Sequence, residues 1–205
     1  MLFSTLLFAT AAWAAAVPQG DDSTNELNFQ LGLPENYTVS DIQWRGFEGF
    51  GEDQVFTGTI ENVISQMRQI KGADYTPSFV SKAESHATTP LPDYHAARHN
   101  IDCGGPEADP RRIDQGVDYL NHIPDSSLCG NAPKTCGRIS CSWNSAIWLC
   151  NDRTDNDNVR KCNMFGQYAA EINKECAIYD SNPRVAGKNS DDQLLLSVLV
   201  KKASC

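Results

Sequence analysis

The chain has 205 residues, 40% of them hydrophobic, and a formal net charge of −9 at neutral pH. This composition indicates a globular protein of one or two domains and excludes an intrinsically disordered chain. The acidity lies in residues 17–100, which hold 12 acidic and 5 basic residues, whereas residues 101–205 hold 14 and 12. An acidic chain without a basic cluster does not fit a protein that binds nucleic acid or anionic membranes through its charge.

The first 16 residues have the pattern of a secretory signal peptide. They form an apolar run that is too short to span a bilayer and that ends in small residues, with candidate cleavage sites between Ala14 and Ala16. A buried N-terminal helix is the alternative, but it does not explain why the chain turns polar after Val17. No later stretch is long and apolar enough to span a membrane. We therefore expect a soluble protein that is secreted to the extracellular space.

All eight cysteines lie at or after residue 103. An even number of cysteines in a secreted chain predicts disulfides, although the spacing alone does not choose among the pairings. A zinc site would favour short spacings such as Cys-x-x-Cys, and none occurs, so we expect no metal and no other cofactor. The chain thus divides into a signal peptide (1–16), an acidic N-terminal region with a linker (17–100) and a cysteine-rich α+β domain (101–205).

The N-terminal region predicts two short strands and one amphipathic helix. Residues 39–47 and 54–59 have strand character, and a glycine-rich segment separates them. Thr59 can cap a helix over residues 60–70, whose apolar residues recur at helical spacing up to Gly72. Together they predict a small α/β unit in front of the cysteine-rich domain.

Two further features of this region concern its surface. Residues 73–100 carry three prolines among polar residues, which indicates a linker or an irregular strap. The sequon Asn36-Tyr37-Thr38 predicts N-glycosylation in a surface loop of a secreted protein.

The first half of the cysteine-rich domain predicts a helix followed by a β-hairpin. Asp109 is a candidate N-cap before Pro110, and an apolar stripe then continues until Pro124 stops the helix. Residues 125–135 have the composition of a loop. Ile139, Cys141 and Trp143 alternate with polar neighbours, and residues 146–149 form an apolar run. This pattern predicts a hairpin over residues 136–150 that turns at Asn144 and Ser145.

The second half predicts another helix and a final strand. Residues 159–176 keep helical spacing, residues 180–192 form a polar turn, and residues 194–200 are a buried strand. The order helix, hairpin, helix and strand predicts an α+β fold. In this fold, helices pack on one face of a small antiparallel sheet that disulfides staple together.

Several short stretches of residues 101–205 form a distinctive cysteine layout: Ile101 to Cys103, Gly137 to Cys141, Asn144 to Ile147, Glu175-Cys176 and the terminal Cys205. In these stretches the chain resembles small secreted cysteine-rich fungal proteins of the smut-fungus killer toxin family, and similar cysteine layouts occur in fungal necrosis-inducing effectors. The resemblance implies a killer-toxin-like sandwich and an activity that blocks cation uptake by target cells, although those toxins are basic and lack an acidic region like residues 17–100.

The expected packing suggests how some cysteines pair. A final strand beside the hairpin would bring Cys205 to Cys141, and a second helix on the same sheet would bring Cys176 to the beginning of the domain. The resemblance implies a nested order for the others. The expected pairs are Cys103–Cys176, Cys129–Cys162, Cys136–Cys150 and Cys141–Cys205.

No residue has the pattern of a catalytic group. The chain has no Gly-x-Ser-x-Gly motif, and its cysteines are expected to be paired. The densest carboxylates, at residues 48, 52 and 53, favour a solvated acidic loop over an acid pair for glycoside cleavage. His95 and His99 can share a helical face, but a third metal ligand is not evident. The histidines are expected in loops or at a helix end: His86, His95, His99 and His122.

Trp143 and Trp148 lie near the predicted hairpin turn. They are either core residues under a disulfide or an exposed contact patch, because tryptophan is enriched in binding hot spots. We expect a secreted, non-enzymatic effector or toxin-like protein that binds an extracellular protein or a cell-surface target of a host or competitor. The alternatives are a secreted hydrolase of unrecognised type and a structural cell-wall or surface protein.

Overall fold

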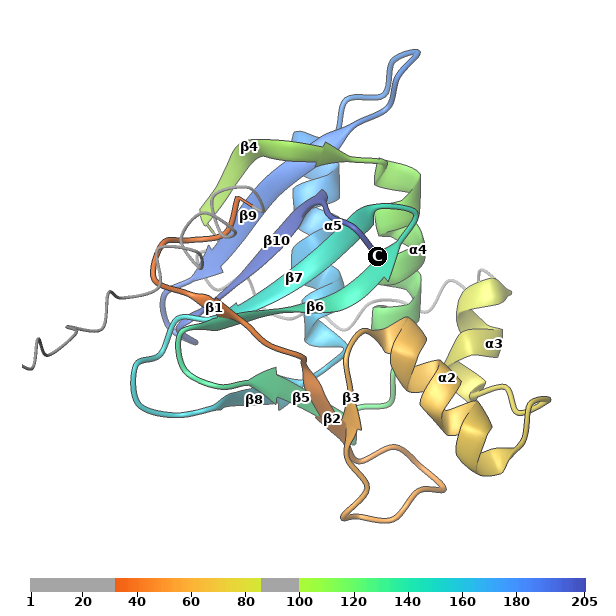
Figure 1. The fold of residues 1–205 in the computed structure, drawn as a ribbon. Coiled ribbons are helices and arrows are strands. Elements are labelled where there is room, and N and C mark those ends of the chain that lie inside the picture. The colour runs from red at the N-terminus through yellow and green to blue at the C-terminus, as the bar shows by residue number, and fades with distance from the viewer. Residues whose placement is uncertain (1–31, 86–99) are drawn as a thin grey trace, which may run out of the picture.

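The structure, a computed structural model, describes residues 32–85 and 100–205. The expected signal peptide and three of the four histidines, His86, His95 and His99, therefore lie outside the described residues. Figure 1 shows a larger sheet with two helices behind one face and a smaller sheet beneath it. The predicted α+β class is confirmed.

The larger sheet has six strands in the order β1-β6-β7-β10-β9-β4. Neighbouring strands are antiparallel, except that β1 runs parallel to β6. The strand that comes last in the chain, β10, thus lies inside the sheet between β7 and β9. The strands are β1 (Thr38–Val39), β4 (Asn100–Ala108), β6 (Thr135–Ser142), β7 (Ser145–Asn151), β9 (Val185–Asp191) and β10 (Leu196–Lys202).

The smaller sheet joins the two halves of the chain. Its order is β3-β2-β5-β8, with all neighbours antiparallel. Trp44 of β2 is fully buried and donates its indole N–H to the carbonyl of Gly58 at 2.8 Å. The strands predicted over 39–47 and 54–59 are much shorter in the structure. They and their partners are β2 (Gln43–Arg45), β3 (Phe56–Thr57), β5 (Leu128–Asn131) and β8 (Asn158–Lys161).

Two helices begin where their sequence signals predict. α2 (Ile60–Lys71) begins after Thr59, whose side chain accepts the N–H of Asn62, and ends at Gly72. α4 (Pro110–His122) begins after Asp109, whose carboxylate accepts the first free N–H of the helix. Both N-caps satisfy backbone donors that the first helical turn leaves unpaired. The helices expected from these signals are confirmed.

The interval 73–100, expected to be a linker or strap, contains a helix in its described part. α3 (Ser78–Glu84) buries Phe79, Val80 and Ala83. The seven residues of α3 are too few to show a clear helical period in the sequence. Packing of its apolar side chains against the core stabilises the helix more than its intrinsic propensity does.

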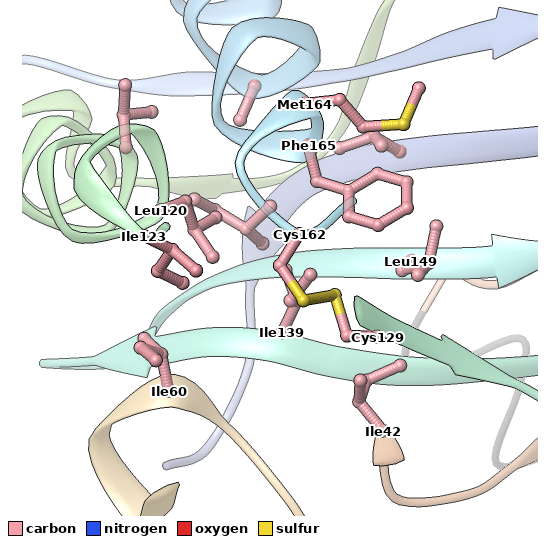
Figure 2. Close-up of a cluster of buried hydrophobic side chains, with 14 of the residues drawn as sticks. Ile42, Ile60, Leu120, Ile123, Cys129, Ile139, Leu149, Cys162, Met164 and Phe165 are labelled. Atoms are coloured by element: carbon pink, nitrogen blue, oxygen red, sulfur yellow. A yellow bond between two sulfur atoms is a disulfide. The ribbon is translucent and has the colours of Figure 1, made fainter. Parts of the chain in front are cut away.

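A single apolar core connects the N-terminal region with the cysteine-rich half. Figure 2 shows Ile42 and Ile60 pointing towards Ile139, Leu120 and Phe165, and all five are fully buried. On one side, this core is covered by α4 and by α5 (Met164–Cys176), the two helices behind the larger sheet in Figure 1. Residues 32–85 are therefore packed onto the cysteine-rich half.

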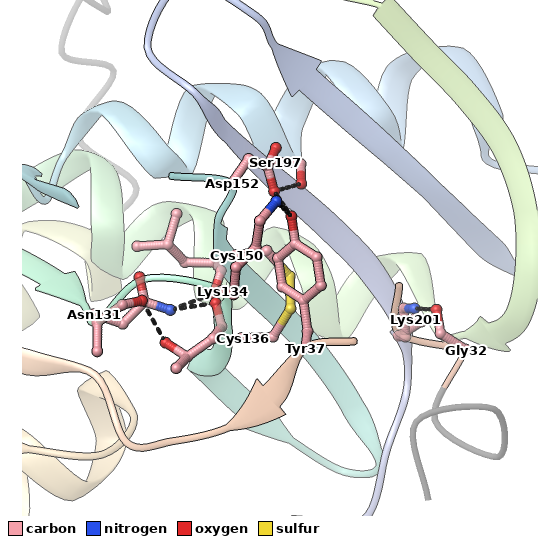
Figure 3. Close-up of a disulfide and its surroundings, with 12 residues drawn as sticks. Gly32, Tyr37, Asn131, Lys134, Cys136, Cys150, Asp152, Ser197 and Lys201 are labelled. Carbon is pink, nitrogen blue, oxygen red and sulfur yellow. Dashed lines mark hydrogen bonds between the residues drawn. A yellow bond between two sulfur atoms is a disulfide. The ribbon is translucent and has the colours of Figure 1, made fainter. Parts of the chain in front are cut away.

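The other face of the larger sheet has its own apolar cluster. Leu33 and Tyr37, in the segment leading into β1, pack there with Trp148 and the Cys136–Cys150 disulfide. Figure 3 shows the phenol of Tyr37 reaching Asp152, to which it donates a hydrogen bond of 2.8 Å. Residues 33–39, which we call the N-terminal strap, thus cover this face of the sheet.

Three of the four disulfides involve strands of the larger sheet, and the fourth, Cys129–Cys162, ties β5 of the smaller sheet to the start of α5. The four disulfides have the same pairs as the nested order expected above: Cys103–Cys176, Cys129–Cys162, Cys136–Cys150 and Cys141–Cys205. Cys136 and Cys150 are directly opposite each other on β6 and β7, at the open end of the hairpin.

Three expectations for the cysteine-rich domain, residues 101–205, were wrong. The helix predicted over 159–176 begins only at Met164, because residues 158–161 pair with β5 as strand β8, and Cys162 therefore precedes the helix. The expected loop 125–135 contains β5, and the expected turn 180–192 contains β9. These strands are rich in polar residues that find partners inside the fold. For example, Asn189 of β9 is fully buried and donates to Glu171 of α5 at 2.8 Å.

Candidate contact surface

The turn of the β6–β7 hairpin has an unusual backbone. Ser142 and Ser145 are the last paired residues, so the turn consists of Trp143 and Asn144, one residue earlier than predicted. Both turn residues have positive φ angles, of 50° and 58°. Two-residue hairpin turns with a positive φ at both positions favour Asn-Gly, and a tryptophan at the first position is conformationally unfavourable.

Several contacts hold this turn in place. The disulfide between Cys141 and Cys205 ties its base to the segment after β10, and the N–H of Ala203 donates to the carbonyl of Asn144 at 3.2 Å. On the other side, the Ser145 hydroxyl accepts the N–H of Asp109, the N-cap of α4, at 3.1 Å. The turn is therefore fixed to both the sheet and the helix layer.

Glu61 on α2 adds a contact from the N-terminal region. Its carboxylate accepts the hydroxyl of Ser140 at 2.6 Å and the N–H of Cys141 at 3.1 Å. Bonds to a carboxylate are stronger than those between neutral groups. They occupy the free edge of β6 next to the turn and connect α2 with the hairpin.

The two tryptophans of the hairpin have different environments. Trp143 is 75% exposed, and the guanidinium of Arg112 lies over its ring at 5.0 Å from the centroid. Because one face of the indole is covered by Arg112, the exposure comes from the other face and the edges. Trp148 is only 2% exposed and packs under the N-terminal strap. Of the two alternatives expected for these tryptophans, Trp148 is a core residue, whereas Trp143 is presented to solvent.

Among residues 32–85 and 100–205, the other candidates from the sequence do not gather into a site. Glu48, Glu52 and Asp53 are exposed in the loop between β2 and β3. His122 lies at the end of α4, where its Nδ1 is 2.7 Å from the carbonyl of Asp118. Within residues 32–85 and 100–205, no three His, Cys, Asp or Glu side chains are grouped as metal ligands would be. The sequon residue Asn36 is exposed, as an acceptor of a glycan must be.

Sequence reasoning missed a polar network that fastens the N-terminal strap. Asp152 accepts hydrogen bonds from Tyr37 and, at 3.2 Å, from Ser197, while the ammonium of Lys134 bonds to the Tyr37 oxygen at 3.1 Å. Burial and the bond to Asp152 raise the pKa of Tyr37. Lys201 lies at the other end of the strap and donates to the carbonyl of Gly32, as Figure 3 shows. The raised pKa disfavours nucleophilic chemistry at the Tyr37 phenol. The hydrogen bonds of the network hold the N-terminal strap against the sheet.

Comparison with known protein families, with curated proteins and with solved structures gives no match for this chain. Among the helices of the described part of the chain, none has the length and hydrophobicity that crossing a bilayer requires. The contact surface is therefore assigned from its own geometry.

Proposed function

We propose that the protein is a secreted, non-enzymatic effector or toxin-like binding protein that acts on a cell-surface target through Trp143. The observation that carries this proposal is the exposed indole, held at a rigid turn by a disulfide and by hydrogen bonds from two layers of the fold. Large aromatic side chains dominate binding hot spots, and a rigid one loses little conformational entropy on binding.

The four disulfides support an extracellular location, because such bonds persist in oxidising compartments. They also constrain the unfolded chain, and each typically contributes about 2–4 kcal/mol to stability. The resemblance of the cysteine-rich half to fungal killer toxins and necrosis-inducing effectors fits the same proposal.

The test applies purified, fluorescently labelled protein to plant leaf tissue and to cultures of competing fungi. We expect binding to one of these cell surfaces, with a visible tissue or growth response. Trp143→Ala should lower binding at least tenfold. Ile70→Ala is the matched control, because Ile70 is a 53%-exposed apolar residue on α2. Absence of binding and of any response on both kinds of cell would refute the proposal.

A further inference from the structure

A hollow lies at the first turn of α4, where the N-cap Asp109 contacts Ser145 of the β6–β7 hairpin. Its volume is about 390 Å³, which is within the range of small-ligand sites. It is open on one side, so a segment of a long polymer can enter it. Its lining residues come from the end of β4, the first turn of α4, the segment before β9 and the end of β10: Glu107, Ala108, Asp109, Arg111, Asn182, Pro183, Arg184 and Lys202.

The hollow and the indole belong to one surface. Arg111 lines the hollow and its neighbour Arg112 lies under Trp143, so a single helical turn connects them. Lys202 of the hollow is paired in register with Ser145, which directly follows the hairpin turn. Figure 1 shows the turn of the β6–β7 hairpin beside the first turns of α4.

Three basic and two acidic side chains line the hollow, and the adjoining Asp180 supplies a third acidic group. Arg111 forms an ion pair with Asp109 at 2.9 Å. Arg184 forms ion pairs with Asp180 at 2.8 Å and with Glu107 at 3.4 Å. With Asp180 counted, the acidic and basic groups balance, so the surface presents both hydrogen-bond donors and acceptors without a strong local field, while the whole chain carries a charge of −9. Such a chain repels polyanions at long range.

We propose that this surface binds a neutral polysaccharide, with a sugar ring on the open face of Trp143 and hydroxyl groups in the hollow. Each sugar hydroxyl both donates and accepts hydrogen bonds, so vicinal hydroxyls match side-by-side carboxylates, guanidinium groups and amides. The flat, apolar face of a pyranose matches an exposed indole. This inference rests on the proposed function and names the chemical class of its target.

The test incubates the intact, disulfide-bonded protein with insoluble chitin, β-1,3-glucan and cellulose, and with polygalacturonate as the acidic comparator. We expect binding to at least one neutral polymer, and its strength should not fall when the salt concentration is raised. Titration calorimetry with the matching hexasaccharide then gives the dissociation constant. Trp143→Ala should weaken binding at least tenfold, whereas Trp143→Phe, which keeps an aromatic face, should lose less.

Asn182→Ala tests the hollow separately from the indole. Asn182 lines the hollow, and its hydrogen bonds to Asp180 and Arg184 use its backbone. We expect a loss of affinity of about threefold or more, the size of one neutral hydrogen bond. Ile70→Ala should bind like the wild type. An equal midpoint of urea unfolding for each variant ensures that the fold is preserved.

The outcomes separate this inference from the proposed function. Absence of binding to all three neutral polymers, or binding that Trp143→Ala leaves unchanged, overturns the inference. If the protein still binds cells through Trp143 under those conditions, the proposed function stands with a different target. Binding to polygalacturonate alone, lost in high salt, also overturns the inference, because charge and not the sugar face would then drive recognition.

Discussion

Because Trp143 has a positive φ angle, we predict that this residue does not contribute to the stability of the fold. A non-glycine residue in the left-handed region costs about 1–2 kcal/mol, and asparagine tolerates that region better than other side chains. Trp143→Asn should therefore relieve about 1 kcal/mol of strain. The same change removes the contact with Arg112, and such a cation–π pair is worth about 0.5–1 kcal/mol at an exposed site. The two effects nearly cancel in the wild-type background.

A double-mutant cycle separates the two effects. In the Arg112→Ala background, the cation–π contact is already absent, so Trp143→Asn should stabilise the protein by about 1 kcal/mol. With a urea m-value of about 2–3 kcal/mol/M, this shifts the unfolding midpoint upwards by about 0.4 M. Asn144→Gly is the control, since it relieves strain at the neighbouring position and should act equally in both backgrounds.

Destabilisation by more than about 1 kcal/mol in both backgrounds would refute this reasoning. The indole would then contribute to folding, and its exposure would be no sign of a binding role. Stabilisation combined with loss of target binding would instead show the trade-off between stability and function that is common at binding sites.

Three further predictions concern the anchoring of the N-terminal region. Glu61→Ala should lower the free energy of unfolding by about 2 kcal/mol, because two bonds to a half-buried carboxylate are lost, and hydrogen exchange at the Cys141 amide should accelerate. Gly137→Ala should cost about 1–3 kcal/mol, since a Cβ there would lie 2.5 Å from the Ser40 carbonyl oxygen, and limited proteolysis should then cleave the strap faster. Burial and the nearby Lys188 lower the pKa of Lys201 to about 8. The unfolded chain therefore binds the extra proton between pH 8 and about 10, and the free energy of unfolding rises with pH in that window. Lys201→Met should abolish this slope in urea titrations at different pH values; an unchanged slope would contradict the assignment.

The sequence predicted the elements whose signals are local. The caps at Thr59 and at Asp109 with Pro110 place the starts of α2 and α4, because capping is decided within one helical turn. The hairpin was also predicted, but its turn was displaced by one residue. The polar residues Asn144 and Ser145 both suit a turn, and only the pairing of Ser142 with Ser145 decides the register.

The rest depended on tertiary contacts that leave no periodic signal. β9 reads as a polar turn because Asn189 and Asp191 are buried against Glu171 and Tyr168 of α5, far away in the sequence. The same limit applies to the contact surface. Alternation along the hairpin does not tell which tryptophan is covered, since Trp148 is buried by a strap that lies more than a hundred residues earlier.

The position of β10 has a consequence for how the protein is made. Ribosomes deliver the chain from its N-terminus, yet the strand that joins the β6–β7 hairpin to β9 and β4 is the last of the described strands to emerge. Until then, the two parts of the sheet expose unpaired edges, and Cys141 has no access to Cys205. Assembly of the sheet must therefore wait until β10 has been synthesised, and oxidation that precedes the arrival of β10 would favour mispaired cysteines. The yield of folded protein should accordingly depend on disulfide isomerase activity in the producing compartment.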